Sequence, residues 1–129
     1  MVLRLLIAAL LGGIIGYERE RAQKPAGFRT LLLVCLGSTL FTIMSVHGFS
    51  GFGMPTDPAR IASNIVAGIG FLGAGTILRG EGAVVGLTTA ATIWVLAAIG
   101  MAVGTGYYLI AVVTSAIAFI VLRLPAHLR

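Results

Sequence analysis

The feature that most constrains this chain is a series of long apolar stretches that leaves little room for a charged surface. These stretches run over residues 2–17, 30–47, 61–78, 84–103 and 107–124. A helix that crosses lipid needs about 20 mostly apolar residues, because lipid offers no water to the backbone. Nine basic and four acidic residues among 129 are too few to cover a water-soluble domain. We therefore predict an all-α membrane protein, a bundle of about five transmembrane helices forming a single domain over residues 1–129. We expect the lipid bilayer around it and no soluble domain in this chain.

The basic residues are distributed unevenly between the two sides of such a bundle. The loops after the first and third helices, together with the C-terminal end, hold seven of them: Arg19, Arg21, Lys24, Arg29, Arg79, Arg123 and Arg129. The opposite side holds Arg4 and Arg60. Because positively charged loops stay in the cytoplasm, we expect an external N-terminus and a cytoplasmic C-terminus. Arg4 leaves one alternative open, in which the N-terminus stays inside because the first helix does not span.

Charge and cysteine content bear on other classes of function. The net charge is +5, but the basic residues gather at the ends of apolar stretches rather than beside aromatic residues, so we expect no nucleic-acid partner. Cys35 is the single cysteine and cannot form an internal disulfide or a cysteine-based metal site. The sequence has no GxSxG motif, no metal-spaced histidine pair and no mid-chain carboxylate pair. We therefore expect no enzymatic activity and no bound cofactor.

Small residues recur at helical spacing in several of the stretches. In the first helix Gly12 and Gly16 belong to a stripe with a period of four residues, which lets another backbone approach closely. The third helix is small on two faces and is therefore expected to be central; its glycines are Gly68, Gly70, Gly73 and Gly75. Small faces on so many helices exceed what one five-helix bundle needs, and we expect a homodimer on this ground.

Residues 68–73 match the pattern GxGxxG. A dinucleotide site needs this pattern after a β-strand, at the start of a helix in a βαβ unit. Here it lies within an apolar stretch, so helix packing is the favoured interpretation. The alternative is a broken helix whose exposed backbone groups line an ion path.

The first helix ends in a cluster of alternating charges, Glu18, Arg19, Glu20 and Arg21. In one interpretation these charges are solvated and anchor the helix end at the membrane interface. In the other, Glu18 or Glu20 points inward and pairs with Arg29 at the start of the second helix.

Polar residues also mark the start of the third helix. Asp57 before Pro58 suits an N-cap, and capping is favoured. The alternative is that Asp57 is an external ligand for a cation such as Mg²⁺, which one or two carboxylates can hold. Asn64, one turn into the helix, needs a partner in lipid and is expected to clamp two helices or, alternatively, to line a path.

The fourth helix carries three threonines near its start, at positions 88, 89 and 92. Threonine hydroxyls in helices usually bond to the backbone carbonyl one turn earlier. We therefore expect a structural role for Thr88 and Thr89.

Four segments resemble a known family pattern. They are GGIIGYERE (12–20), AGFRTLLLVCLGSTLF (26–41), DPARIASNIVAGIGFLGAG (57–75) and GLTTAATIW (86–94). In this order they resemble the membrane domain of the MgtC/SapB family and cover most of the chain. The resemblance implies a helical protein of the bacterial plasma (inner) membrane, associated with adaptation to low magnesium. For the best-known members it also implies virulence and inhibition of the F-type ATP synthase.

The resemblance also assigns residues to motifs. The positions that fall in family motifs are Glu18, Arg19, Glu20, Arg29, Thr30, Asp57, Arg60, Asn64, Thr88 and Thr89. Two departures from the family pattern stand out. Members linked to virulence carry a cytosolic C-terminal domain, so this chain is either a fragment or a short member. Val85 also stands where such members can have an arginine, and both departures weaken transfer of the ATP-synthase role.

Two functions follow as hypotheses. The first is a regulatory protein of magnesium homeostasis that acts through helix contacts with a membrane partner, as the small-residue faces suggest. The second is a small transporter or channel for Mg²⁺ or another cation, suggested by Asp57, Asn64 and the glycine-rich third helix. A structural role alone for these polar groups is the third interpretation.

Overall fold

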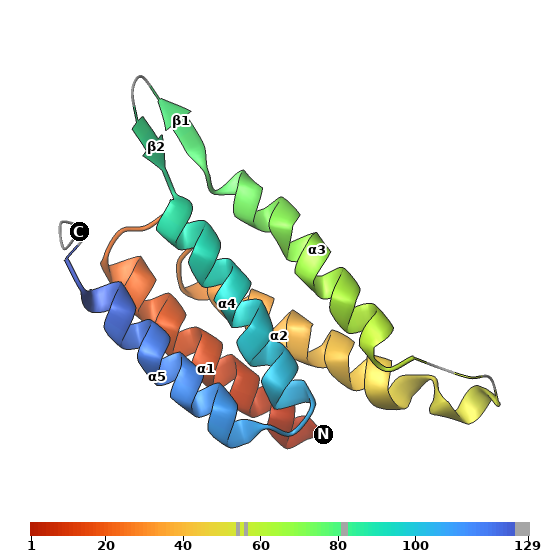
Figure 1. The fold of residues 1–129 in the computed structure, drawn as a ribbon. Coiled ribbons are helices and arrows are strands. Elements are labelled where there is room, and N and C mark those ends of the chain that lie inside the picture. Colours follow the sequence, from red (N-terminus) through yellow and green to blue (C-terminus); the bar gives the residue numbers. More distant parts are fainter. Residues whose placement is uncertain (54, 56, 81–82, 126–129) are drawn as a thin grey trace.

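The computed structural model is an up-and-down bundle of five helices with a short β-hairpin at one end (Figure 1). It describes residues 1–53, 55, 57–80 and 83–125. The helices are α1 (Val2–Arg21), α2 (Phe28–Ile43), α3 (Ala59–Gly75), α4 (Leu87–Gly104) and α5 (Tyr108–Arg123). The predicted all-α bundle is thereby confirmed. The basic residue Arg129 lies outside the described residues.

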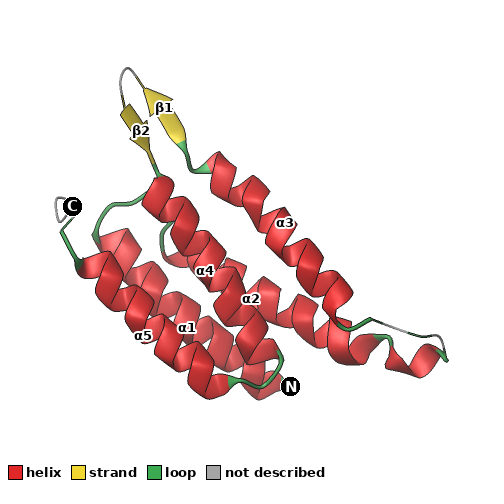
Figure 2. Ribbon diagram, in the orientation of Figure 1, coloured by secondary structure: helices red, strands yellow, loops and turns green. Residues whose placement is uncertain are grey.

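Membrane-spanning length is clearest for two helices. The helical stretch Phe28–Gly48, which continues α2 through a π-helical turn at Met44–Gly48, and α4 are both long and apolar enough to cross a bilayer. α3 and α5 are apolar but shorter, and α1 ends in a charged cluster. Figure 2 shows that α1, α2, α4 and α5 run side by side, with α3 on the outside of the bundle.

The connection between α3 and α4 differs from the prediction. Strands β1 (Leu78–Gly80) and β2 (Ala83–Val85) pair antiparallel, with Leu78 opposite Val85. The third helix therefore ends at Gly75 rather than residue 78, and the fourth begins at Leu87 rather than residue 84. The physical reason is Gly86, which takes a left-handed φ of 99° and whose hydrogen faces the Thr76 carbonyl, where no side chain would fit.

Backbone caps set the ends of α1 and α4. α1 extends through the charged cluster, as expected, and ends where Gln23 takes a φ of 58° and the Lys24 amide donates to the Arg19 carbonyl. α4 ends in a Schellman motif in which Gly106, at a φ of 90°, and Tyr107 donate to carbonyls of the last turn. This turn brings α5 back antiparallel beside α4.

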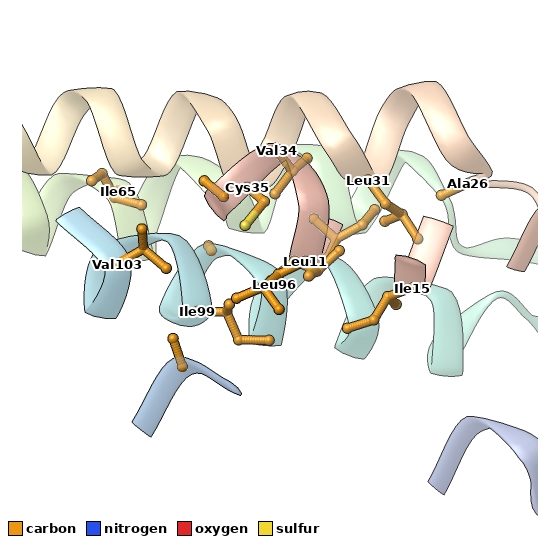
Figure 3. Packing of buried hydrophobic residues seen from close by; sticks show 14 residues of the cluster. Leu11, Ile15, Ala26, Leu31, Val34, Cys35, Ile65, Leu96, Ile99 and Val103 are labelled. Carbon is orange, nitrogen blue, oxygen red and sulfur yellow. The ribbon is translucent and has the colours of Figure 1, made fainter. Parts of the chain in front are cut away.

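The core lies between α1, α2 and α4 (Figure 3). Leu11 and Ile15 of α1 meet Leu31 of α2 and Leu96 and Ile99 of α4. α4 buries residues along its whole length, whereas α3 buries only Ile65 and Gly73 among its seventeen residues. The expectation that the third helix is central is therefore wrong within one chain, because its small residues face outward.

Candidate functional site

The α1–α2 interface is built on the predicted glycine stripe. A Cβ on Gly12 would lie 2.8 Å from the Cys35 Cβ, and one on Gly16 would lie 2.8 Å from the Phe28 Cα. Distances this short leave no room for a methyl group unless the helices separate. Gly12 and Gly16 thus set how closely α2 approaches α1.

The α2–α4 interface combines glycines with hydroxyl groups that the sequence analysis did not single out. The Ser38 hydroxyl donates to the Ala97 carbonyl at 2.6 Å, and the Thr39 hydroxyl donates to the Gly100 carbonyl at 2.9 Å. A Cβ on Gly100 would lie 2.6 Å from the Cys35 carbonyl oxygen, and one on Gly104 would lie 2.8 Å from the Thr42 Cβ. The four-residue spacing of Gly100 and Gly104 is the sequence signal that could have predicted this close helix–helix interface.

Arg4 is a second residue whose role the sequence did not reveal. Its Nη1 donates to the Gly104 carbonyl at 2.7 Å, and its Nε donates to the Tyr108 hydroxyl at 3.1 Å. This cation satisfies the last carbonyl of α4, that of Gly104, at the end of the helix where the dipole is negative. Arg4 therefore ties the start of α1 to the α4–α5 turn.

α3 presents a continuous small-residue surface, which we call the outer face of α3. It consists of Ser63, Asn64, Ala67, Gly68, Gly70, Phe71, Ala74 and Gly75, all of them exposed. A Cβ on Gly68, Gly70 or Gly75 would meet nothing within 4 Å, and one on Gly73 would make an ordinary contact with Ala90 at 3.6 Å. Of the four α3 glycines predicted to pack, Gly73 thus contacts α4, and the other three have open space beside them.

The GxGxxG segment lies wholly within α3, which begins at Ala59, with no strand immediately before it. This context does not match that of a dinucleotide site. The helix is continuous from Ala59 to Gly75, so the broken-helix alternative is wrong as well.

Asn64 lies on the outer face of α3 at the edge of a groove between α2 and α3. The groove has a volume of about 420 Å³ and is lined mainly by apolar side chains, with Ser38 and Asn64 as its polar residues. Ser38 donates to Ala97, whereas the Asn64 amide makes no hydrogen bond within the described part of the chain. An amide that lies in lipid without a hydrogen-bond partner in its own chain is stabilised by a partner from another molecule.

The charged cluster at the end of α1 is asymmetric. Arg19 is buried, with 3% exposed, and its Nη1 lies 3.7 Å from Glu18 Oε2. Arg19 Nε and Glu18 Oε2 make no hydrogen bond to the residues described. Glu20 is exposed and lies beside Gly27. Glu18 thus pairs with Arg19. Neither Glu18 nor Glu20 pairs with Arg29, so the alternative, which required such a pair, is wrong.

Arg29 and Thr30 are exposed in the first turn of α2, at the same end of the bundle as the charged cluster. In α4, Thr88 is exposed and Thr89 is buried, and the Thr92 hydroxyl donates to the Thr88 carbonyl at 2.7 Å. The Thr92 bond has the helix-backbone pattern expected of such threonines.

Asp57 lies at the other end of the bundle, before α3. Its Oδ1 accepts a hydrogen bond from the Ala59 amide at 2.9 Å, but the N-cap position of α3 is Pro58, so Asp57 lies one residue further out than predicted. Asp57 and Arg60 both line a cavity of about 220 Å³. A guanidinium beside the carboxylate disfavours a cation there, and the described residues contain no group of three or more His, Cys, Asp or Glu side chains placed to hold a metal. The Mg²⁺ ligand role of Asp57 stays a prediction.

The structure does not bring all the predicted residues to one place. The charged cluster, Arg29 and Thr88 lie near one end of the bundle, Asp57 and Arg60 lie near the other, and Asn64 lies on α3. The arrangement therefore offers surfaces for helix contacts rather than one concentrated polar centre.

The chain is similar in sequence to several known proteins. A family model described as MgtC family matches residues 5–129. The chain is 46% identical over 126 residues to "Putative magnesium transporter YhiD" of Escherichia coli, covering 95% of this chain and 59% of that protein. It is 48% identical over 107 residues to protein MgtC of Salmonella typhimurium, covering 83% of this chain and 44% of that protein. It is 42% identical over 113 residues to protein SapB of Bacillus subtilis, covering 84% and 49%.

The chain thus spans about half of the length of these relatives. No solved structure matches it.

Proposed function

The chain belongs to the MgtC family of membrane proteins, and on this premise we propose that it acts in magnesium homeostasis by binding a helix of another membrane protein. The binding surface in this proposal is the outer face of α3. The protein lies in the bacterial plasma membrane, with the N-terminus outside and the C-terminus in the cytoplasm. Its role is regulatory rather than enzymatic.

The observation that carries the proposal is the open state of the glycines on this face. Gly68, Gly70 and Gly75 have nothing within 4 Å of an added Cβ, whereas Gly12 and Gly16 are closely covered by α2. Association of helices in lipid depends on close van der Waals packing, which small residues allow. Phe71, 83% exposed, stands among the small residues of this face, where a partner helix would cover it.

Asn64 adds a polar contact to the same face. Its amide can donate and accept hydrogen bonds, and such a bond between membrane helices contributes about 0.6 kcal/mol on average. The link to magnesium rests on the names of relatives, one of which refers to a magnesium transporter. Binding to the F-type ATP synthase, implied for the best-known members, is one candidate for the partner.

Photo-crosslinking from α3 tests the proposal. A photoreactive amino acid replaces Phe71 in one variant and Leu109 of α5 in the other, because both side chains are strongly exposed, at 83% and 77%. In cells grown at low magnesium, we expect a discrete adduct with a membrane protein from position 71 and none from position 109. Equal yields of the same adducts from both positions would overturn the proposal.

A second variant separates binding from folding. Gly70→Ile adds a side chain to the outer face of α3, where the structure leaves space. We expect the protein to accumulate in the membrane at normal levels while the adduct from position 71 is lost and growth at low magnesium is impaired. An adduct with a second copy of the chain would identify a homodimer as the occupant of this face.

Cation transport is the second candidate function, favoured by the name of the Escherichia coli relative. Purified protein in liposomes is then expected to move Mg²⁺ or another cation faster than empty vesicles do. Asp57→Asn keeps an oxygen that can cap α3 but removes the charge, and it is expected to slow the flux. Flux equal to that of empty vesicles would rule this function out.

A further inference from the structure

A second surface, independent of α3, lies between the ends of α1 and α5. A cavity of about 350 Å³ is lined by three residues of α1, by the residue that follows it and by two residues of α5, namely Tyr17, Glu18, Arg21, Ala22, Phe119 and Arg123. Both helices end at this side of the bundle (Figure 1). The cavity therefore opens where a transmembrane bundle meets the lipid headgroups.

The net positive charge of this cavity comes from two arginines, which outnumber its one carboxylate, that of Glu18. The Glu18 carboxylate is directed toward Arg19, with Oε2 buried 3.7 Å from the Arg19 Nη1. Among the residues that the structure describes, neither Arg21 nor Arg123 pairs with a carboxylate. Each guanidinium lies near an aromatic ring instead, Arg21 at 5.9 Å from the Tyr17 centroid and Arg123 at 5.8 Å from that of Phe119. Two arginines on aromatic neighbours form a positively charged site whose counter-charge is not supplied by this part of the chain.

An apolar groove continues from the cavity along the same two helices. It has a volume of about 310 Å³, and its walls are Leu11, Ile14 and Ile15 of α1 and Val112, Ser115, Ala116, Phe119 and Ile120 of α5. Phe119 lines both spaces. Leu11, Ile14, Glu18 and Arg21 follow one another at intervals of three or four residues. One face of α1 therefore lines both the groove and the cavity. The Ser115 hydroxyl donates to the Ala111 carbonyl and leaves the groove apolar.

The dimensions of the two spaces fit a lipid. From Leu11 to Arg21 the helix rises about 15 Å, at 1.5 Å per residue. One leaflet contributes about half of the roughly 30 Å hydrocarbon thickness of a bilayer. An acyl chain in the groove would therefore reach the bilayer interior while its phosphate lies beside the two arginines.

We propose that the α1–α5 cavity and groove bind an anionic phospholipid of the phosphatidylglycerol type. The phosphate accepts hydrogen bonds from Arg21 and Arg123, and one acyl chain fills the groove from Phe119 toward Leu11. Arginine recognises phosphate with its planar set of donors, and basic pockets between transmembrane helices suit lipid headgroups. The apolar groove distinguishes a lipid from a soluble phosphate, which has no group to fill it.

Lipid binding to the purified, delipidated chain tests the proposal. Native mass spectrometry in detergent would measure the occupancy of phosphatidylglycerol, phosphatidylcholine and glycerol 3-phosphate. We expect phosphatidylglycerol to bind best, since its net charge is −1. Two arginines at about 1 kcal/mol each correspond to a preference of about thirtyfold, of which Arg21→Gln with Arg123→Gln removes most.

A charge-matched control uses Lys24→Gln with Arg29→Gln, which removes two charges at the same end of the bundle but outside the cavity. This variant is expected to retain phosphatidylglycerol. A third variant, Ala116→Phe, fills the groove at an exposed position and is expected to lower occupancy while the helical circular dichroism spectrum is unchanged. Equal loss in both double variants, equal binding of phosphatidylcholine, or equal binding of glycerol 3-phosphate would each overturn the site.

Discussion

The interfaces among α1, α2 and α4 and the outer face of α3 use the same residue type in opposite ways. A Cβ on Gly12, Gly16, Gly100 or Gly104 would lie within 3 Å of an atom of α2. A Cβ on Gly68, Gly70 or Gly75 would meet nothing within 4 Å. Small residues lie on a helix surface in both regions, but only in the first does a neighbouring helix of this chain pack directly against the glycines. Small-residue spacing therefore indicates that a surface can be approached, and the rest of the fold decides which helix approaches it.

The largest expected effect on stability comes from Gly100→Ala. The added methyl group would lie 2.6 Å from the Cys35 carbonyl oxygen and 2.8 Å from the Ser38 Cβ, so α2 and α4 must separate. We expect the free energy of unfolding in detergent to fall by about 1 to 3 kcal/mol, as for other overpacked cores. Denaturant titration followed by circular dichroism measures the change, and unchanged stability would contradict the closely packed α2–α4 interface.

Arg4→Met is expected to have the next largest effect. It removes the hydrogen bonds to the Gly104 carbonyl and the Tyr108 hydroxyl while keeping an apolar stem of similar length. Bonds from a charged donor contribute about 1.5 to 3 kcal/mol when well made, so a loss of about 1 to 2 kcal/mol is expected for this partly buried group. The same unfolding titration applies. Tyr108→Phe removes one of the two bonds and should cost less; a larger loss for Tyr108→Phe would show that Arg4 does not tie the turn.

Ser38→Ala tests the hydroxyl bonds between α2 and α4. It removes the 2.6 Å bond to the Ala97 carbonyl and leaves the packing almost unchanged. We expect a loss of about 0.6 kcal/mol, the average for hydrogen bonds between membrane helices. A double variant with Thr39→Ala, which removes the bond to Gly100, should lose about twice as much. No measurable loss in the double variant would show that glycine packing alone holds this interface.

Gly70→Ala is expected to have the smallest effect on the free energy of unfolding, and it should raise that free energy rather than lower it. The methyl group enters open space on α3, and alanine favours a helix over glycine by about 1 kcal/mol. The isolated chain should therefore unfold at the same or a slightly higher denaturant concentration. Comparison with Gly100→Ala is direct, since the substitution is identical. Similar losses in the two variants would mean that the outer face of α3 is covered within this chain.

Residue patterns alone predicted most of the bundle. The apolar stretches located five helices, and the four-residue stripe selected Gly12 and Gly16, which α2 covers closely. The β-hairpin was missed because Val84 and Val85 extend the apolar stretch of α4, while the turn depends on the φ of Gly86. Arg4 was treated as a topology signal, since its partners are about a hundred residues away in the chain.

The sequence by itself determined that this polypeptide is a membrane helix bundle of the MgtC family, because apolar length and motif order are local properties of the chain. Only the tertiary structure decided which small faces are filled. Helical spacing places Ser38, Gly100 and Gly70 each on a face, but it carries no information about which helix lies opposite. That choice depends on contacts between residues far apart in sequence, and these place α2 against α1 and α4 and leave the outer face of α3 uncovered by this chain.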